Sequence, residues 1–259
     1  MPDALRLALG TLTRLPVPTP RTVDRQTAGA AMVLAPLVGG LLALVVGVVV
    51  QVLAAHAPAT ASTALFAALA IAVLAYTTRG LHLDGLADTA DALGSGRPPE
   101  QALQIARRSD IGPFGVVTVV LVLLVQVTAY AGLVGTGRAA LGLVIAAGTA
   151  RLSLALSCAR GVPAARSDGL GATVAGSVPI LAAAAAAIGW LAFCCGLTAV
   201  LIPSAVPASA LAVLGALLVT GIGLRVCVRR LGGITGDVLG ALIELSFAAA
   251  LVILVAVPS

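Results

Sequence analysis

The sequence predicts an all-α membrane protein, a polytopic helical bundle of about seven transmembrane helices with a short interfacial helix at the N-terminus. Its 259 residues are 60% hydrophobic and 10% charged, whereas soluble domains carry roughly 25% charged residues. Apolar runs long enough to cross a bilayer recur along the chain, and the charges gather in alternate connections between them. We therefore expect a single integral membrane domain over residues 1–259.

The first element is a short amphipathic helix over residues 3–15. Leu5, Leu9 and Leu12 recur at helical spacing, and Pro16 is expected to end the helix. Arg14 interrupts the apolar sequence, which argues against a cleavable signal. The helix is therefore expected to lie in the membrane interface.

Apolar runs account for the rest of the fold. Most of them reach the roughly 20 residues needed to cross the hydrocarbon core. The second run is short, and the first is long and contains Pro36, which favours a kink. The runs lie near 30–55, 62–78, 114–135, 139–158, 179–202, 207–224 and 238–257.

The connections between the runs differ in charge. Residues 1–29, 79–113, 159–178 and 225–237 hold thirteen of the fifteen basic residues, all of them Arg, and the short connections hold only Arg138. The positive-inside rule then places the charged connections and the N-terminus in the cytoplasm of a bacterial cell, and the C-terminus outside. Because the Arg residues form no stripe interleaved with aromatic residues, we expect no nucleic-acid partner.

The acidic residues also lie mostly on one side of the membrane. Nine of the ten lie on the charged side, and Glu244 enters the last span from that side. The positive-inside rule concerns Lys and Arg and does not account for acids. A polar working face is the explanation we favour.

The most informative stretch is RGLHLDGLADTADALG, residues 79–94. If this stretch is helical, Asp84, Asp88 and Asp91 lie on one face, at i, i+4 and i+7. Neighbouring carboxylates repel one another, and a hard cation such as Mg²⁺ prefers oxygen ligands. We therefore expect a magnesium site here, with a solvated acidic helix face as the alternative. His82 is a candidate phosphate or hydroxyl partner, although a lone His is often incidental.

Two further stretches contain groups that could bind phosphate. In ARRSDIGPFG, residues 106–115, the Arg107 and Arg108 guanidinium groups match phosphate oxygens in a two-point fork, or else the two residues only anchor the topology. Asp110 could cap the next helix or join a metal site. In RRLGGITGDVLGALIEL, residues 229–245, a Gly-rich turn including Gly236 precedes a span, where backbone N–H groups suit phosphate.

Two ionisable residues fall within predicted spans, namely Glu244 and Arg151. Such groups are costly in a bilayer and are functional candidates by default. That the two form a pair is a hypothesis. Carboxylates for a metal and arginines for phosphate, at a membrane face, together indicate phosphoryl transfer, in which a protein mainly positions groups and neutralises charge.

Four blocks resemble those of the cobalamin synthase family, adenosylcobinamide-GDP ribazoletransferase. They are LTRLPVP (12–18), GLHLDGLADTADALG (80–94), SDIGPFG (109–115) and GGITGDVLGALIEL (232–245), in family order. The resemblance implies that the chain joins α-ribazole, or its 5′-phosphate, to adenosylcobinamide-GDP and releases GMP, with Mg²⁺ required. A ribose hydroxyl would attack the phosphate that bears the cobinamide arm.

The resemblance also implies residue roles. Asp84 and Asp88 would be metal ligands, and Asp91 a third ligand or the base. Asp237 would complete the metal site. The diphosphate would be bound by Arg79, Arg107 and Arg108.

The chain departs from the family pattern at two positions. Ala92 stands where a Gly commonly follows the third aspartate, and Phe247 stands where another carboxylate is often found. These differences weaken the case for several acids on the last helix and leave the triplet of aspartates intact.

Two alternative functions fit the sequence less well. A membrane phosphotransferase that acts on a CDP-alcohol also clusters aspartates, but its pattern has an Arg after DGxxA, where this chain has Asp88. A transporter using Arg151 and Glu244 would need polar residues along several spans, and these spans are almost wholly aliphatic. Besides membrane lipid, a homo-oligomer or an association with other corrinoid enzymes is a further prediction.

Overall fold

Helices long enough to span a membrane dominate the fold. The computed structural model describes residues 1–58, 60–108 and 110–258, and every regular element in those ranges is a helix. The helices are α1 (Asp3–Leu12), α2 (Arg25–His56), α3 (Thr63–Thr77), α4 (Leu81–Gly94), α5 (Pro99–Ile105), α6 (Pro113–Gly135), α7 (Ala139–Ser157), α8 (Gly169–Val174), α9 (Ile180–Leu201), a 3₁₀ turn (Pro203–Ala205), α10 (Val206–Leu231) and α11 (Gly236–Ala256).

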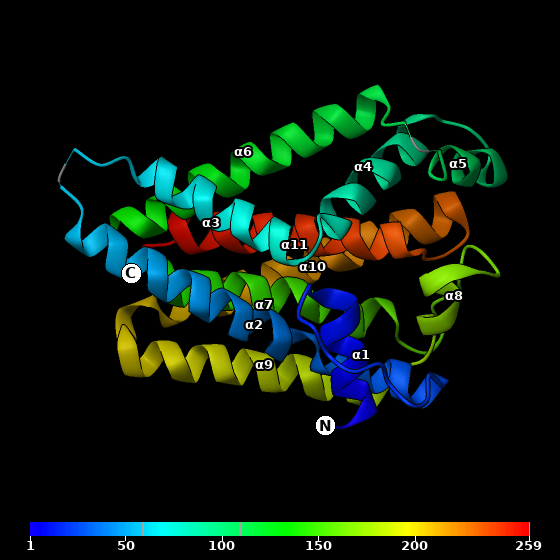
Figure 1. The fold of residues 1–259 in the computed structure, drawn as a ribbon, viewed down its shortest axis with the longest axis horizontal. Helices are drawn as coiled ribbons and strands as arrows, with labels where there is room; N and C mark the ends of the chain where they lie inside the picture. The colour runs from blue at the N-terminus through cyan, green and yellow to red at the C-terminus, as the bar shows by residue number, and fades with distance from the viewer. Residues whose placement is uncertain (59, 109, 259) are drawn as a thin grey trace.

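The spanning helices confirm the predicted multi-pass membrane protein. In the described ranges six helices, α2, α6, α7, α9, α10 with its 3₁₀ turn, and α11, are each long and apolar enough to cross a bilayer. The short run expected over 62–78 is α3, which reaches the same criterion only together with α4, at a bend of 89°, so the described ranges hold six candidate spans or up to seven. The bend leaves α4 at one end of the bundle, outside the six spanning helices (Figure 1).

The boundaries differ from the prediction mainly at three helices, and the first of them, α2, begins at Arg25 rather than near residue 30. The span expected over 207–224 continues to Leu231, because Arg229 and Arg230 occupy its last turn, where basic side chains suit the helix dipole. The helix expected over residues 3–15 ends at Leu12, where the Thr13 hydroxyl donates to the Leu9 carbonyl at 2.7 Å. The structure therefore ends that helix before Pro16. The interfacial position of α1 stays a prediction.

The bundle has a central helix. Of the residues in the spanning part of α7, 83% are buried, against 17% for α9, and α7 packs against α2, α9, α10 and α11. Ala and Gly are frequent along α7, and small residues allow helices to approach closely in a membrane. The more exposed helices carry large aliphatic side chains that suit lipid.

The two ends of the bundle differ in character. In Figure 1 the helices α4, α5 and α8 and the junction of α10 with α11 gather at the right-hand end, and the short connections lie at the left. The charged connections predicted to share one side are therefore brought together in space. Any binding site for a charged substrate is expected at this end.

Candidate active site

The acidic helix α4 owes its direction to a sharp turn. Arg79 and Gly80 both adopt left-handed backbone conformations, with φ of 61° and 69°. Glycine adopts this conformation readily, whereas it is strained for Arg. The Arg79 guanidinium donates to the carbonyls of Gly10 at 2.8 Å and Thr13 at 3.2 Å. These bonds tie the turn to the end of α1, so Arg79, predicted to bind diphosphate, has a structural task here.

The predicted stripe of aspartates exists, but its members have different surroundings. α4 is helical over Leu81–Gly94, as expected. Asp84 is exposed, Asp88 is half-buried, and Asp91 is only 7% exposed. The first two are therefore the more accessible to a ligand.

Asp91 holds the start of α6. Its two carboxylate oxygens accept the backbone N–H groups of Gly112, at 2.7 Å, and Gly115, at 2.9 Å. Such N–H groups at a helix start otherwise lack partners. Asp91, rather than Asp110 as the sequence suggested, therefore caps this helix. Its predicted role as metal ligand or base stays a prediction.

A close helix contact brings a fourth aspartate to the stripe. A Cβ atom at Gly85 would lie 2.7 Å from the carbonyl oxygen of Asp237 and 2.9 Å from its Cα. Glycine at this position of α4 therefore allows the first turn of α11 to touch it. Asp237 belongs to that turn, and Thr235 caps it by accepting the N–H of Val238. The contact places Gly85 and Asp237, 152 positions apart in the chain, beside each other.

The electrostatics of the four carboxylates confirm that they interact. The pKa of Asp88 is raised to about 6, first by burial and then by the neighbouring charges of Asp84, Asp237 and Asp91. Each ionised carboxylate makes ionisation of the next less favourable. A cation placed among these groups would relieve their repulsion.

The donor set fits Mg²⁺ in a particular way. Over the described ranges no three or more Asp, Glu, His or Cys side chains are arranged to hold a metal ion by themselves, so the four predicted ligands do not form a protein cage. Mg²⁺ is commonly bound by one or two carboxylates together with substrate phosphates and water. Asp84, Asp88 and Asp237 suit that arrangement better than Asp91, whose oxygens already accept two N–H groups.

Arg166 is a site residue that the sequence did not reveal. Its Nη1 lies 3.6 Å from Asp237 Oδ2, and its Nη2 donates to the Leu103 carbonyl at 2.7 Å. The connection that carries it is fixed to the turn before α11, because Ala165 N–H donates to the Ile234 carbonyl at 2.9 Å. No local pattern distinguishes this Arg from the other loop arginines, so only the tertiary contact could identify it.

The other predicted phosphate ligands are exposed at the same face. An oxygen of Asp168 accepts from Arg107 Nη2 at 2.6 Å, and both side chains are more than half exposed. Arg108 and Asp110 are exposed as well. All four side chains are accessible to a charged substrate.

Two cavities adjoin the aspartates. One, of about 320 Å³, is lined by Asp84, Arg166, Gly236 and Asp237 together with apolar residues of α1, α2, α7 and α11. The other, of about 370 Å³, is lined by Asp88, Asp91, Ser95, Ile105, Arg108, Asp110, Ile111, Gly112, Pro113 and Phe114. Since Asp84 and Asp88 lie one helical turn apart on α4, the acidic stripe runs between the two cavities.

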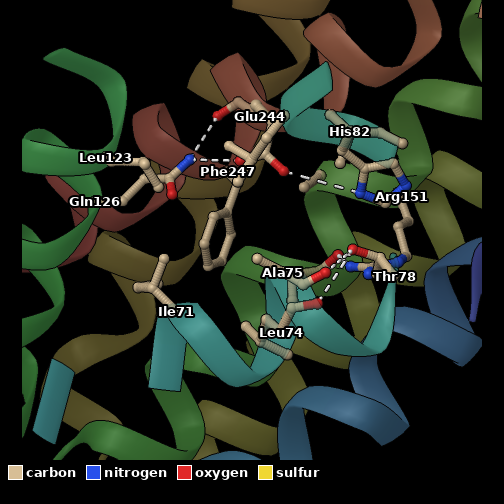
Figure 2. A pocket seen from close by; sticks show the side chains of 14 residues that line it. Ile71, Leu74, Ala75, Thr78, His82, Leu123, Gln126, Arg151, Glu244 and Phe247 are labelled. Atoms are coloured by element: carbon tan, nitrogen blue, oxygen red, sulfur yellow. Dashed lines mark hydrogen bonds and ion pairs between the residues drawn. The ribbon is translucent and has the colours of Figure 1, made fainter. Parts of the chain in front are cut away.

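His82 points into the bundle. Its Nδ1 lies 3.8 Å from Glu244 Oε1, and Glu244 Oε2 accepts from Gln126 Nε2 at 2.7 Å. Figure 2 shows Glu244 between Gln126 and His82 in a small internal cavity. His82 therefore joins α4 to α11, and a role toward phosphate stays a prediction, although it also lines the 320 Å³ cavity.

The suggested pair of Arg151 and Glu244 is not an ion pair. Both line the internal cavity, but Arg151 Nη1 donates to the carbonyl of Ala147 at 3.3 Å. Among the described residues Glu244 instead lies 3.8 Å from His82, a contact that is charged only when the imidazole is protonated.

Comparisons with known proteins show the family of the chain. The family model described as cobalamin-5-phosphate synthase matches residues 4–255. A Frankia casuarinae protein named adenosylcobinamide-GDP ribazoletransferase is 43% identical over 96% of this chain and 93% of its own. Proteins of the same name from Nocardioides sp. and Pseudomonas aeruginosa are 40% and 39% identical, with at least 97% of each chain covered. No solved structure matches the chain.

The family model covers nearly the whole chain, and the relatives align over almost their full lengths. The matched residues include α4, the start of α6 and the first turn of α11, which together carry the aspartates described above. The chain belongs to the cobalamin-5-phosphate synthase family.

Proposed function

We propose that this transferase of cobalamin synthesis moves the adenosylcobinamide-phosphate group of adenosylcobinamide-GDP onto α-ribazole or its 5′-phosphate. A ribose hydroxyl oxygen forms a bond to the phosphorus that bears the cobinamide arm. The bond between that phosphorus and the bridging oxygen breaks, GMP leaves with the electron pair, and the hydroxyl proton passes to a base. The observation that carries the proposal is the contact of α4 with α11, which gathers Asp84, Asp88 and Asp237 beside Arg166.

The carboxylates would hold Mg²⁺, with Asp84, Asp88 and Asp237 as the residues that fit it. When bound, the ion would neutralise charge on the diphosphate. Arg166 lines the cavity at Asp237, where its guanidinium can bind a phosphate oxygen. Arg107 and Arg108 are proposed to bind the diphosphate from the exposed side.

We propose Asp88 as the base in place of Asp91. The two oxygens of Asp91 already accept backbone N–H groups, and displacing either bond would uncap α6. Asp88 is half-buried and lines the cavity on the α6 side of α4. Asp88 is one helical turn from Asp84, which lines the other cavity.

The alternatives have less support. A CDP-alcohol phosphotransferase is disfavoured by the family match. For a transporter, Arg151 and Glu244 would have to line a continuous path, but the cavity that they share has a volume of only about 30 Å³. That is about one water-sized probe or two.

We also propose that the site faces the cytoplasm of a bacterial cell. The excess of Arg in the connections at the site's end of the bundle supports this orientation. Homo-oligomers or assemblies with other corrinoid enzymes stay predictions.

The test is a transfer assay with purified protein, adenosylcobinamide-GDP and α-ribazole, with Mg²⁺ or with EDTA. We expect GMP and the cobamide to form only with Mg²⁺, and Asp88→Asn to lower kcat by at least about a hundredfold. Glu100→Gln, an exposed carboxylate of α5 outside the site, serves as the matched control and should keep full activity. Activity in EDTA would exclude the metal, and full activity of Asp88→Asn would exclude Asp88 as base.

A further inference from the structure

The 320 Å³ cavity has more apolar lining than phosphate binding requires. Besides Asp84, Arg166 and Asp237, its walls include Met32 of α2 and Leu154 of α7. Met32 and Leu154 are each only 2% exposed, so the cavity reaches the interior of the bundle. A site for a diphosphate alone would need charged or N–H groups at those positions.

The depth of the cavity follows from α11. Asp237, Gly240 and Ile243 all line it, and they follow one another at spacings of three residues along one side of the helix. With a rise of 1.5 Å per residue, Ile243 lies about 9 Å further into the bundle than Asp237. The cavity is therefore charged where α11 begins and apolar where Ile243, 3% exposed, closes it.

The size and lining of the cavity indicate which part of the two substrates it could bind: the corrin ring, the guanine or the dimethylbenzimidazole base. A volume of about 320 Å³ is at the small end of the roughly 300–1,000 Å³ typical of ligand sites, too small for a corrin ring with its side chains. Guanine carries several donors and acceptors on its edge. Beside Gly240 only His82 could partner them, and Met32, Leu154 and Ile243 would leave the others without partners, at a cost. The dimethylbenzimidazole base of α-ribazole is flat and apolar, with one free ring nitrogen.

We propose that the deep part of this cavity binds the benzimidazole base of α-ribazole, with the ribose at the charged end. The inference rests on the proposed function and deepens it. The ribose hydroxyl is then presented beside Asp84 and Asp237. The second cavity, on the Asp88 side of α4, is left for the diphosphate of adenosylcobinamide-GDP, because its volume of about 370 Å³ is also too small for the corrin ring. The apolar residues thus select the base, and the aspartates act on the hydroxyl.

Met32 is the residue that tests the assignment. Met32→Trp fills the deep cavity, and Met32→Ala enlarges it. Leu37→Trp places the same large side chain on α2 at a position that is 54% exposed and lies outside the cavity, so it is the matched control. The Michaelis constants for both substrates are measured, together with competition among α-ribosides of benzimidazole, dimethylbenzimidazole and naphthimidazole.

We expect Met32→Trp to raise the KM for α-ribazole at least about tenfold. The variant should also prefer the riboside without methyl groups, since one methylene in an apolar site changes the discrimination between substrates by about 10–200-fold. The KM for adenosylcobinamide-GDP should stay within about twofold in the same variant. Met32→Ala should shift the preference toward naphthimidazole, and it carries the test if Met32→Trp does not fold. Leu37→Trp should behave as the parent chain.

A changed KM for adenosylcobinamide-GDP with an unchanged preference among bases would overturn the assignment. If the parent chain makes no product from the two substrates, the proposed function fails, and equilibrium dialysis then tests the cavity by itself. Binding of α-ribazole to the parent chain that Met32→Trp weakens supports the inference. Absence of binding, or binding that Met32→Trp leaves unchanged, refutes it.

Discussion

Single residues of α4 show how one acidic stripe serves two purposes. Asp88 is half-buried beside Asp84 and Asp237, and these neighbours raise its pKa to about 6. Asp91, one turn further along, is buried with two backbone N–H groups that point at its oxygens. Asp88 is therefore held among like charges, and a cation bound with the substrate would neutralise them. Asp91 instead stabilises the fold.

This difference gives a prediction for stability. Asp91→Asn retains only one acceptor oxygen for two N–H groups and adds an amide that donates, so the start of α6 loses a buried partner. We expect the free energy of unfolding to fall by about 1–3 kcal/mol, measured as a lower midpoint in thermal unfolding of the detergent-solubilised protein. Asp88→Asn should show no such fall. An unchanged midpoint for Asp91→Asn would contradict the capping role.

The raised pKa of Asp88 predicts a pH dependence. Folding raises the pKa from 3.8 to about 6, so the folded chain binds the proton more tightly than the unfolded chain, and the ionised side chain weakens the fold above that pH. In EDTA, Asp88→Asn should therefore be more stable than the parent chain at about pH 7.5, and the gap should narrow as the pH falls below about 6 and close near the unfolded-state pKa of 3.8. Thermal unfolding of both proteins across this pH range measures the difference in stability, with Glu100→Gln as control. A gap that does not vary with pH would argue against the neighbouring charges.

Among the elements, the pair α4 and α11 decides whether a site exists at all. Gly85 meets the backbone of Asp237, and two turns deeper His82 and Gln126 both contact the carboxylate of Glu244. These polar contacts connect α4, α6 and α11 within the bundle (Figure 2). The position of Asp237 beside Asp88 is therefore a property of helix packing.

The contact at Gly85 gives a prediction at this scale. Gly85→Ala would place a Cβ 2.7 Å from the Asp237 carbonyl oxygen, and backbone atoms cannot rotate away, so the helices must separate. We expect a loss of about 1–3 kcal/mol in stability and a lower kcat, measured by thermal unfolding and the transfer assay. Gly221→Ala in α10, where a Cβ would meet nothing within 4 Å, is the matched control. Equal effects at the two glycines would show that the close approach is not needed.

The whole molecule separates a charged end from an apolar body. The 320 Å³ cavity begins among charged residues at that end and continues between spanning helices, so one site offers both ionic and apolar surroundings. A soluble fold could provide such a cavity too, but here the bundle interior supplies the apolar part directly. This arrangement suits the proposed attack of a ribose hydroxyl on a diphosphate, in which the attacking substrate carries an apolar base.

The orientation of the bundle is testable by chemical labelling. In a cysteine-free background, Ser204→Cys, exposed between α9 and α10, should react in intact cells with a membrane-impermeant thiol reagent. Glu100→Cys, exposed on α5 at the charged end, should react only after lysis. This result is expected because Arg-rich connections stay in the cytoplasm. The reverse labelling pattern would invert the proposed topology.

The sequence by itself determined the local features of this protein. Apolar runs of membrane length predicted the spanning helices, the spacing of Asp84, Asp88 and Asp91 predicted a helical stripe, and four motifs predicted the family. Each of these features depends on residues close together in the sequence. Their hydrophobic periodicity and composition reflect whether lipid or water surrounds them.

Only the tertiary structure decided which residues meet. The contact of Gly85 with Asp237, the position of Arg166 and the pairing of His82 with Glu244 join segments far apart in the chain. Packing between helices fixes such contacts. It depends on how side chains of different helices fit together, and the periodicity of the sequence does not show this fit. For the same reason Asp91, third in a regular stripe, became a cap for α6, because the start of that helix happened to lie against it.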